Sequence, residues 1–315
     1  MMNIPAYLQP GDLIGITCPA SKMDRPVAEF AAGVLSSWGY RVRIGNTAGM
    51  HYHNFSAPDE VRRGELQEML DDPEIRAILF GRGGYGMVRI IDQLDFSRFC
   101  QYPKWLCGYS DITTLHLHVH ARLGIPTLHS MMCSGITSLT VQDPYVESLR
   151  QVWRGGDIHY HFPAHPLNRQ GTCRGMLIGG NLSLLTNLSG TAAAPDMARK
   201  ILLIEDVGEY LYNIDRMMMN LKRAGWLEKL SGLLLGSFTA SQETDTPFGQ
   251  TAYEIILDKV KEYAFPVAFG FPAGHQPENY TLKLGVPYTL HTGEPCFLKE
   301  ETQPAPYHDH HPALS

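Results

Sequence analysis

Strand and helix signals alternate through the first half of this chain, and this alternation restricts the fold more than any other feature. Apolar runs predict buried strands at 12–18, 41–44, 75–80, 104–109 and 125–128. Apolar residues at helical spacing predict a helix at 24–38, and further helices are predicted at 57–71, with charges on one side, and at 112–122. Repeated strand–helix–strand units form a parallel sheet with helices on both faces. The sequence therefore predicts an α/β fold, with ligands bound at the carboxyl ends of the strands.

The pattern breaks between 155 and 172 into His, Pro, Gly and polar residues, which predicts a connection between two domains. A second series of strands and helices follows and ends near residue 298. A chain of 315 residues also suits two cores better than one. We expect an N-terminal α/β domain over 1–160, a smaller C-terminal α/β domain over 170–302, and a disordered tail over 303–315, which is rich in Pro and His.

Charge and composition argue against several classes of function. The net charge is −6 without a basic stretch, so a nucleic-acid partner is not expected. No apolar run approaches the roughly 18 residues of a membrane span, and the N-terminus shows no secretory signal. The six cysteines are scattered without a C-x-x-C pair, as in reduced cytoplasmic proteins. No cluster of His, Asp and Glu predicts a metal, and we expect neither a metal nor a cofactor.

Ser110 lies where a predicted strand passes into a predicted helix, in the segment Gly108-Tyr-Ser-Asp111. Such a turn exposes a serine hydroxyl beside a helix N-terminus, as the nucleophile elbow of hydrolases does. That elbow usually has glycine two residues after the serine, and here the position is Ile112. A simple helix cap by Ser110 or Asp111 is the alternative interpretation.

The loop 81–86, Gly-Arg-Gly-Gly-Tyr-Gly, allows several interpretations. Gly81, Gly83 and Gly86 fit a dinucleotide fingerprint, which keeps an NAD-binding oxidoreductase as an alternative, although no suitable acidic residue follows about 20 positions later. A Walker loop is excluded because Gly-Lys-Ser/Thr is absent. The loop is also typical of a tight turn, and its exposed backbone N–H groups suit an oxyanion.

A general base for Ser110 cannot be chosen by proximity, because the chain contains 14 histidines. His275 stands out because it follows an apolar strand in a loop framed by Gly and Pro, where a side chain can project into a cleft. Glu205 ends the apolar run 200–204, and a buried carboxylate there must be hydrogen-bonded or functional. Asp206 and Glu209 are its rivals, and a helix-cap role suits both of them.

Several short motifs follow one another along the chain, at Gly83–Gly86, Gly108–Thr113, Gly179–Leu182, Leu203–Glu209 with Asp215–Met217, Leu235–Phe238 and Gly274–His275. The combined pattern resembles the LD-carboxypeptidase family (peptidase family S66), which also contains the microcin C immunity peptidases. The resemblance covers about residues 10–298. It implies an N-terminal parallel-sheet domain of flavodoxin-like or glutaminase-like type and a C-terminal α/β domain, with the active site between them.

The resemblance implies a catalytic triad of Ser110, His275 and Glu205. In such a triad the imidazole takes the serine proton and the carboxylate orients the imidazole. We expect the oxyanion to be held by the backbone N–H groups of Asp111, directly after the nucleophile, and of Gly84 in the glycine loop.

The family's substrate is the murein tetrapeptide, from which it releases terminal D-alanine by cleaving an LD-peptide bond during peptidoglycan recycling in the cytoplasm. A carboxypeptidase must recognise a free carboxylate, and Arg82 and Asn181 are the candidate substrate-binding residues. The resemblance also implies a homodimer. The alternative within the family is an immunity-type peptidase that acts on an aminoacyl-nucleotide.

Overall fold

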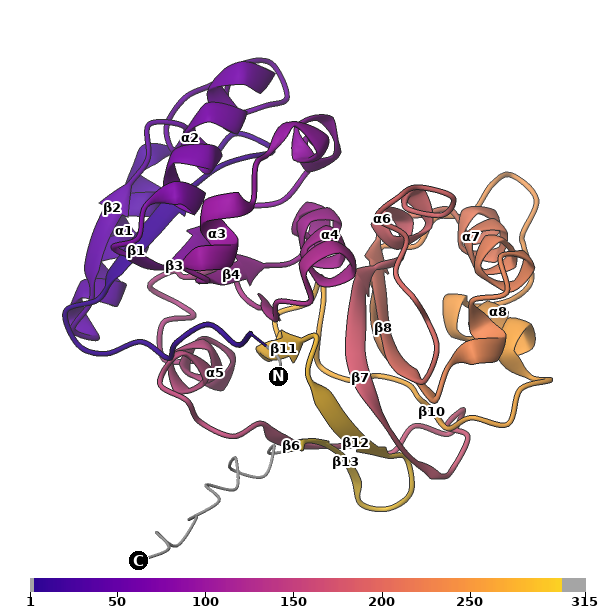
Figure 1. The fold of residues 1–315 in the computed structure, drawn as a ribbon. Helices are drawn as coiled ribbons and strands as arrows, with labels where there is room; N and C mark the ends of the chain where they lie inside the picture. The colour runs from indigo at the N-terminus through magenta and orange to yellow at the C-terminus, as the bar shows by residue number, and fades with distance from the viewer. Residues whose placement is uncertain (1–2, 302–315) are drawn as a thin grey trace, which may run out of the picture.

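Two β-sheets lie side by side in the computed structural model, which describes residues 3–301 (Figure 1). The expected disordered tail, 303–315, lies outside the described residues. Within residues 3–301, no helix is both long enough and apolar enough to cross a membrane. The α/β class predicted from the alternating pattern is confirmed.

The first sheet has six strands in the order β11-β5-β4-β3-β1-β2. Their bounds are β1 Leu13–Thr17, β2 Arg41–Ile44, β3 Ile75–Phe80, β4 Trp105–Gly108, β5 Thr127–His129 and β11 Leu282–Leu284. The first five are parallel, whereas β11 pairs antiparallel with β5. The predicted parallel sheet is therefore completed by one antiparallel strand from the far end of the chain.

Helices cover both faces of this sheet, as the strand–helix alternation requires. On one face α1 (Arg25–Ser37) and α5 (Pro144–Trp153) bury apolar residues against the strands. The other face is covered by α2 (Asp59–Asp71), α3 (Ser97–Gln101) and α4 (Thr113–Leu123). Short 3-10 turns occur at Met87–Arg89, Ile91–Gln93, Ser110–Ile112, Cys133–Gly135 and Leu227–Lys229.

The second sheet has seven strands in the order β10-β9-β8-β7-β12-β13-β6. Their bounds are β6 His159–Phe162, β7 Thr172–Asn181, β8 Lys200–Val207, β9 Gly232–Thr239, β10 Val267–Ala268, β12 Pro287–His291 and β13 Cys296–Glu300. Strands β7 to β10 are parallel, and β12, β13 and β6 join them through antiparallel pairs. Helices α6 (Leu182–Asn187), α7 (Leu211–Arg223) and α8 (Ala252–Val260) pack on one face.

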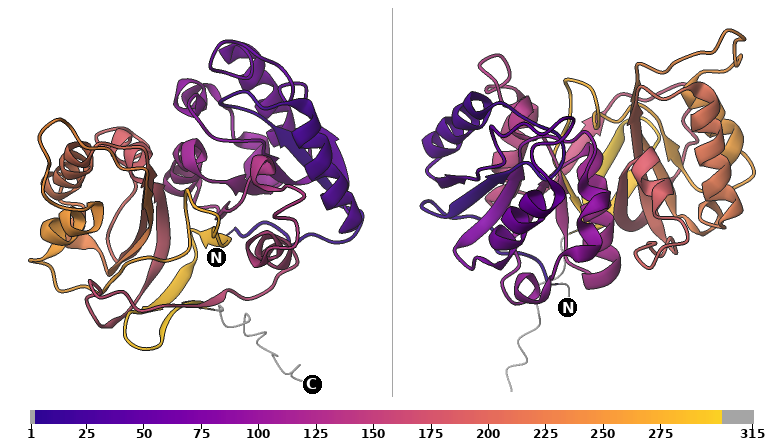
Figure 2. Two further views of the ribbon diagram at one scale, coloured as in Figure 1. Left: turned by 180° about the vertical axis from the view of Figure 1, so that it is seen from behind. Right: turned by 90° about the horizontal axis from the view of Figure 1, so that it is seen from above.

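A continuous apolar core joins the two sheets. Leu203 and Leu234, from the second sheet, belong to the same buried cluster as Leu79 and Cys107 of the first sheet and Leu149 of α5. The face of the second sheet that α6 to α8 leave free is thereby covered by the other half of the molecule, as the views in Figure 2 also show. Burial of this shared core holds the carboxyl ends of β4 and β8 in a fixed relation.

The segment predicted to connect the two domains, 155–172, contains strand β6, which the sequence did not predict. Its alternating His159-Tyr-His-Phe162 has only Phe162 buried, because β6 is the edge strand of its sheet. An edge strand needs only one apolar face. The polar residues of β6 therefore gave no apolar run from which a strand could be predicted. The domain boundaries proposed at 160 and 170 stay a prediction.

Candidate active site

Ser110 lies on the sharp turn between β4 and α4, at the carboxyl end of its strand. Its backbone φ is +61°, a left-handed conformation that costs a non-glycine residue about 1–3 kcal/mol. Ile112 occupies the place where an elbow usually has glycine. Its side chain is fully buried against Gly108, where an added Cβ would come within 3.0 Å of Ile112 Cγ1. The close approach that the turn requires is therefore provided by Gly108.

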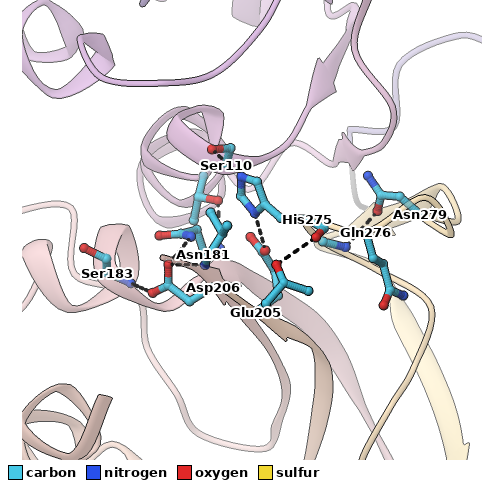
Figure 3. A network of polar contacts seen from close by, with 12 residues as sticks. Ser110, Asn181, Ser183, Glu205, Asp206, His275, Gln276 and Asn279 are labelled. Atoms are coloured by element: carbon cyan, nitrogen blue, oxygen red, sulfur yellow. Dashed lines mark hydrogen bonds and ion pairs between the residues drawn. The ribbon is translucent and has the colours of Figure 1, made fainter. Parts of the chain in front are cut away.

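The side chains of Ser110, His275 and Glu205 form one chain of hydrogen bonds across the meeting point of the two sheets (Figure 3). Ser110 Oγ lies 3.0 Å from His275 Nε2, and His275 Nδ1 lies 2.7 Å from Glu205 Oε2. A neutral imidazole with its proton on Nδ1 satisfies both contacts, because Nδ1–H donates to the carboxylate and Nε2 accepts from the hydroxyl.

The loop that carries His275 is fitted closely to Glu205. Gly274 has φ +104°, and a Cβ there would lie 2.6 Å from Glu205 Oε2. Only glycine allows this approach of backbone to carboxylate. Thr239 Oγ1 at the end of β9 donates to the His275 carbonyl at 2.9 Å, which adds a further anchor.

Glu205 is fully buried within β8. The sequence placed it at the strand end, but the strand continues to Val207, and the register with β9 is irregular beside Glu205. At Gly236 in that irregularity, a Cβ would lie 3.1 Å from Glu205 Cβ and 2.5 Å from the Ala273 carbonyl. Such irregularities redirect side chains near functional sites, and here the bulge makes room for Glu205 and the His275 loop.

The electrostatic surroundings favour a basic imidazole at His275. Burial lowers its pKa, but the hydrogen bond and negative charge of Glu205 outweigh burial, and the charge of Asp206 acts in the same direction. The net result is a pKa above the usual 6.5. His275 is thus a stronger base than a free imidazole.

Asp206, a rival of Glu205 in the sequence, points to the start of α6 instead. Its Oδ1 accepts from Asn181 Nδ2 at 2.8 Å, and its Oδ2 accepts from Ser183 N at 3.0 Å. Burial raises its pKa to about 6. Asn181 also caps α6, because its Oδ1 accepts from Leu184 N at 3.2 Å. Both side chains therefore hold α6 against β8, and a contact of Asn181 with substrate stays a prediction.

The glycine loop packs directly against Ser110. A Cβ at Gly83 would lie 2.8 Å from Ser110 Cβ and 3.3 Å from the backbone N of Asp111. Among residues 3–301, no hydrogen bond uses the backbone N–H of Gly84 or of Asp111. Arg82 is exposed on the same loop and donates to the Lys22 carbonyl at 3.4 Å. These features suit an anion held beside the serine.

Two buried charges hold the glycine loop in this place. Arg62 is fully buried and donates from Nη1 to the Gly86 carbonyl at 3.1 Å. The Asp111 carboxylate accepts from Met87 N at 2.8 Å. Burial raises the Asp111 pKa to about 6, although the hydrogen bonds from Met87 and Gly86 act against that rise. Neither charge was singled out for this role in the sequence, because the contacts join distant segments.

Replacing Gly83 with alanine is expected to impair the site more than the fold. The added methyl group would overlap Ser110 and Asp111, so the loop must move, at a stability cost of about 1–3 kcal/mol. A displacement near 1 Å at a reacting group typically lowers the rate by about 10²-fold. Measuring both the turnover and the thermal unfolding of the variant tests this expectation. The matched control is Gly64→Ala in α2, where an added Cβ meets no atom within 4 Å. Wild-type turnover in Gly83→Ala would contradict it.

Comparison with known proteins assigns the family. The model of the LD-carboxypeptidase N-terminal domain matches residues 14–130, and that of the LD-carboxypeptidase C-terminal domain matches residues 174–290. The chain belongs to the LD-carboxypeptidase family. The resemblance stated from the motifs is thereby confirmed, as is the expectation of a hydrolase. The oxidoreductase alternative is wrong, and the glycine loop that suggested it packs against the serine.

The relatives extend over nearly the whole chain. A "Probable murein peptide carboxypeptidase" of Bacillus subtilis is 32% identical over 293 residues, which cover 92% of each chain. A murein tetrapeptide carboxypeptidase of Pseudomonas aeruginosa is 30% identical over 86% of this chain and 91% of the relative.

Solved structures share the arrangement of the LD-carboxypeptidase fold. A muramoyltetrapeptide carboxypeptidase of Oxalobacter formigenes superposes with a TM-score of 0.82 at 26% identity, over 93% of this chain and all of the other. The microcin C7 self-immunity protein MccF superposes with a TM-score of 0.83 over 94% of this chain and 98% of its own. At 22% identity, the second likeness concerns the fold.

Proposed function

We propose that this LD-carboxypeptidase is a serine enzyme that releases terminal D-alanine from murein tetrapeptides by hydrolysing the LD-peptide bond. The observation that carries the proposal is the hydrogen-bonded series from Ser110 Oγ through His275 to the buried Glu205. The names of the relatives from Bacillus subtilis and Pseudomonas aeruginosa support the same substrate class. The proposal includes action in the cytoplasm, where such peptides are recycled, and assembly as a homodimer.

In the proposed mechanism, Ser110 Oγ attacks the carbonyl carbon of the scissile bond while His275 Nε2 takes the hydroxyl proton. Glu205 holds the imidazole in the required tautomer and stabilises the imidazolium that forms. His275 then gives the proton to the amine of the leaving D-alanine, and a water molecule hydrolyses the acyl-enzyme by the same route. Acid–base transfer of this kind contributes about 10²–10⁴ in rate.

The oxyanion of the tetrahedral intermediate is assigned to the backbone N–H groups of Asp111 and Gly84. Support comes from the unused hydrogen-bonding capacity of both groups among the described residues and from the close packing of Gly83 on Ser110. Losing one such donor costs about 3–4 kcal/mol in comparable sites. Arg82 is proposed to attract the terminal carboxylate of the peptide, because it is an exposed cation on that loop.

The pH dependence of the reaction is expected to follow the raised pKa of His275. Only the neutral imidazole accepts the serine proton, so kcat/KM should fall as the pH drops through this pKa. Because the Glu205 interaction holds the pKa above the usual 6.5, the acidic limb should have its midpoint above that value. A kcat/KM profile from pH 5 to 9 measures it, and a midpoint well below 6.5 would contradict the assignment of His275.

The substrate is tested by incubating the protein with an L-Ala-D-Glu-diamino acid-D-Ala tetrapeptide and measuring free D-alanine. A matched peptide with L-alanine at the terminus is the control, because it lacks the LD bond. An aminoacyl-sulfamoyl nucleotide tests the immunity-type alternative, which the structural likeness to MccF keeps in view. Hydrolysis of the nucleotide without release of D-alanine would replace the proposed substrate.

A further inference from the structure

His129 is the last residue of β5, which lies between the strand that leads to the serine and the strand that follows the His275 loop. In the order β11-β5-β4, His129 is paired with Leu282 on one side and Gly108 on the other. Gly108 is two residues before Ser110, and Leu282 follows the His275 loop. The residue therefore adjoins both segments that must be aligned for proton transfer.

The hydrogen bonds of His129 lead directly to the loop of His275. His129 Nε2 lies 3.1 Å from Asn279 Oδ1, and the same oxygen accepts from Gly274 N at 3.0 Å (Figure 3 labels Asn279). Both His129 and Asn279 are fully buried. Gly274 is the residue directly before His275, so the chain of contacts is short and inaccessible to water.

The donor roles in this network follow from the chemistry. The Gly274 N–H can only donate, which identifies the shared Asn279 atom as the carbonyl oxygen. His129 must then donate from Nε2–H, leaving Nδ1 unprotonated, and among residues 3–301 Nδ1 has no partner. Burial lowers the pKa of His129 to about 3, so this imidazole stays neutral. It therefore contributes one fixed hydrogen bond and does not compete for the serine proton.

We infer that His129 is a positioning residue that fastens the His275 loop to the first sheet through Asn279. The inference rests on the proposed function of His275 as the base for Ser110. His129 is fully buried and forms no ion pair within residues 3–301, and a role as a loop anchor explains its burial. The ring of Tyr109 packs against both imidazoles, with ring centres 5.7 Å from His129 and 4.9 Å from His275.

Substitutions at 129 that keep or remove the donor test this inference. In His129→Leu the donor is lost at similar size, and kcat should fall about 10–100-fold, as expected for a misplaced reacting group, with KM within about twofold. In His129→Gln the side-chain amide N reaches the place of Nε2, and kcat should be restored to within about threefold of wild type. Lys104→Met removes buried bonds to the Met69 and Asp72 carbonyls at the opposite end of β4 and controls for lost stability alone.

A second measurement, the pKa of His275, tests the inference without depending on which substrate the enzyme hydrolyses. The imidazole pKa of His275, measured by NMR, should fall in His129→Leu, because a loosened loop weakens contact with Glu205, and should be unchanged in Lys104→Met. Wild-type kcat together with an unchanged His275 pKa in His129→Leu would overturn the inference. Absence of D-alanine release by the wild-type protein would instead overturn the proposed function, and the NMR comparison would still decide the role of His129.

Discussion

Replacing Ser110 with alanine is expected to abolish D-alanine release, with kcat reduced by about 10⁵–10⁶-fold, as for loss of a serine nucleophile in a comparable triad. The hydroxyl that His275 contacts at 3.0 Å is then missing, and no acyl-enzyme can form. The measurement is D-alanine release under single-turnover conditions, together with labelling by a fluorophosphonate, which should also disappear. Turnover within tenfold of wild type would remove Ser110 from the mechanism.

The fold of this variant should be preserved, because alanine and serine meet the same strain at φ +61°. Ser110→Gly is the informative partner, since glycine adopts that conformation without a Cβ penalty. It should be equally inactive but more stable than Ser110→Ala by about 1 kcal/mol. Thermal unfolding of the two variants measures the strain that the turn imposes on the serine, and equal stability would show that the turn is relaxed.

Replacing Glu205 with glutamine should lower kcat by about 10³–10⁴-fold, by analogy with loss of the carboxylate in other serine triads. Glutamine preserves the size of the side chain but cannot stabilise the imidazolium that forms during attack. The His275 pKa should also fall, because burial continues to disfavour the charged ring while the Glu205 charge is gone. NMR titration of His275 in the variant measures that change.

Glu209→Gln is the matched control for this experiment. Glu209 was a rival acid in the sequence, and its carboxylate accepts from Asn213 Nδ2 at 3.0 Å in α7 rather than from His275. The turnover of the Glu209→Gln variant should remain within about threefold of wild type. A large loss in Glu209→Gln with an active Glu205→Gln would reverse the assignment of the acid.

The parts of the fold that the sequence predicts well are those with a strong local pattern. Strands such as β3 and β8 are almost wholly buried, and their continuous apolar runs identify them directly. Strand pairing between distant segments has no such local pattern. For this reason β11 in the first sheet and β6 in the second were not predicted.

The residues of the candidate site also differ in how well a local sequence pattern predicts them. Ser110 is suggested by its place at a strand–helix turn, whereas selecting His275 among 14 histidines depended on its loop and on the family resemblance. His129 and Asn279 were not found, since a histidine within a short apolar strand looks like an ordinary core residue. Only the pairing of β5 with β4 and β11 shows what it contacts.

Strand β11 has a consequence for how the enzyme is made. The edge of the first sheet beside β5 stays open until Leu282–Leu284 is available, yet synthesis delivers the N-terminal strands first. On the ribosome, a nascent chain therefore carries its serine long before the histidine and the closing strand emerge. In the proposed mechanism, a polypeptide released before residue 275 lacks the base that accepts the Ser110 proton, and we expect such a fragment to be inactive.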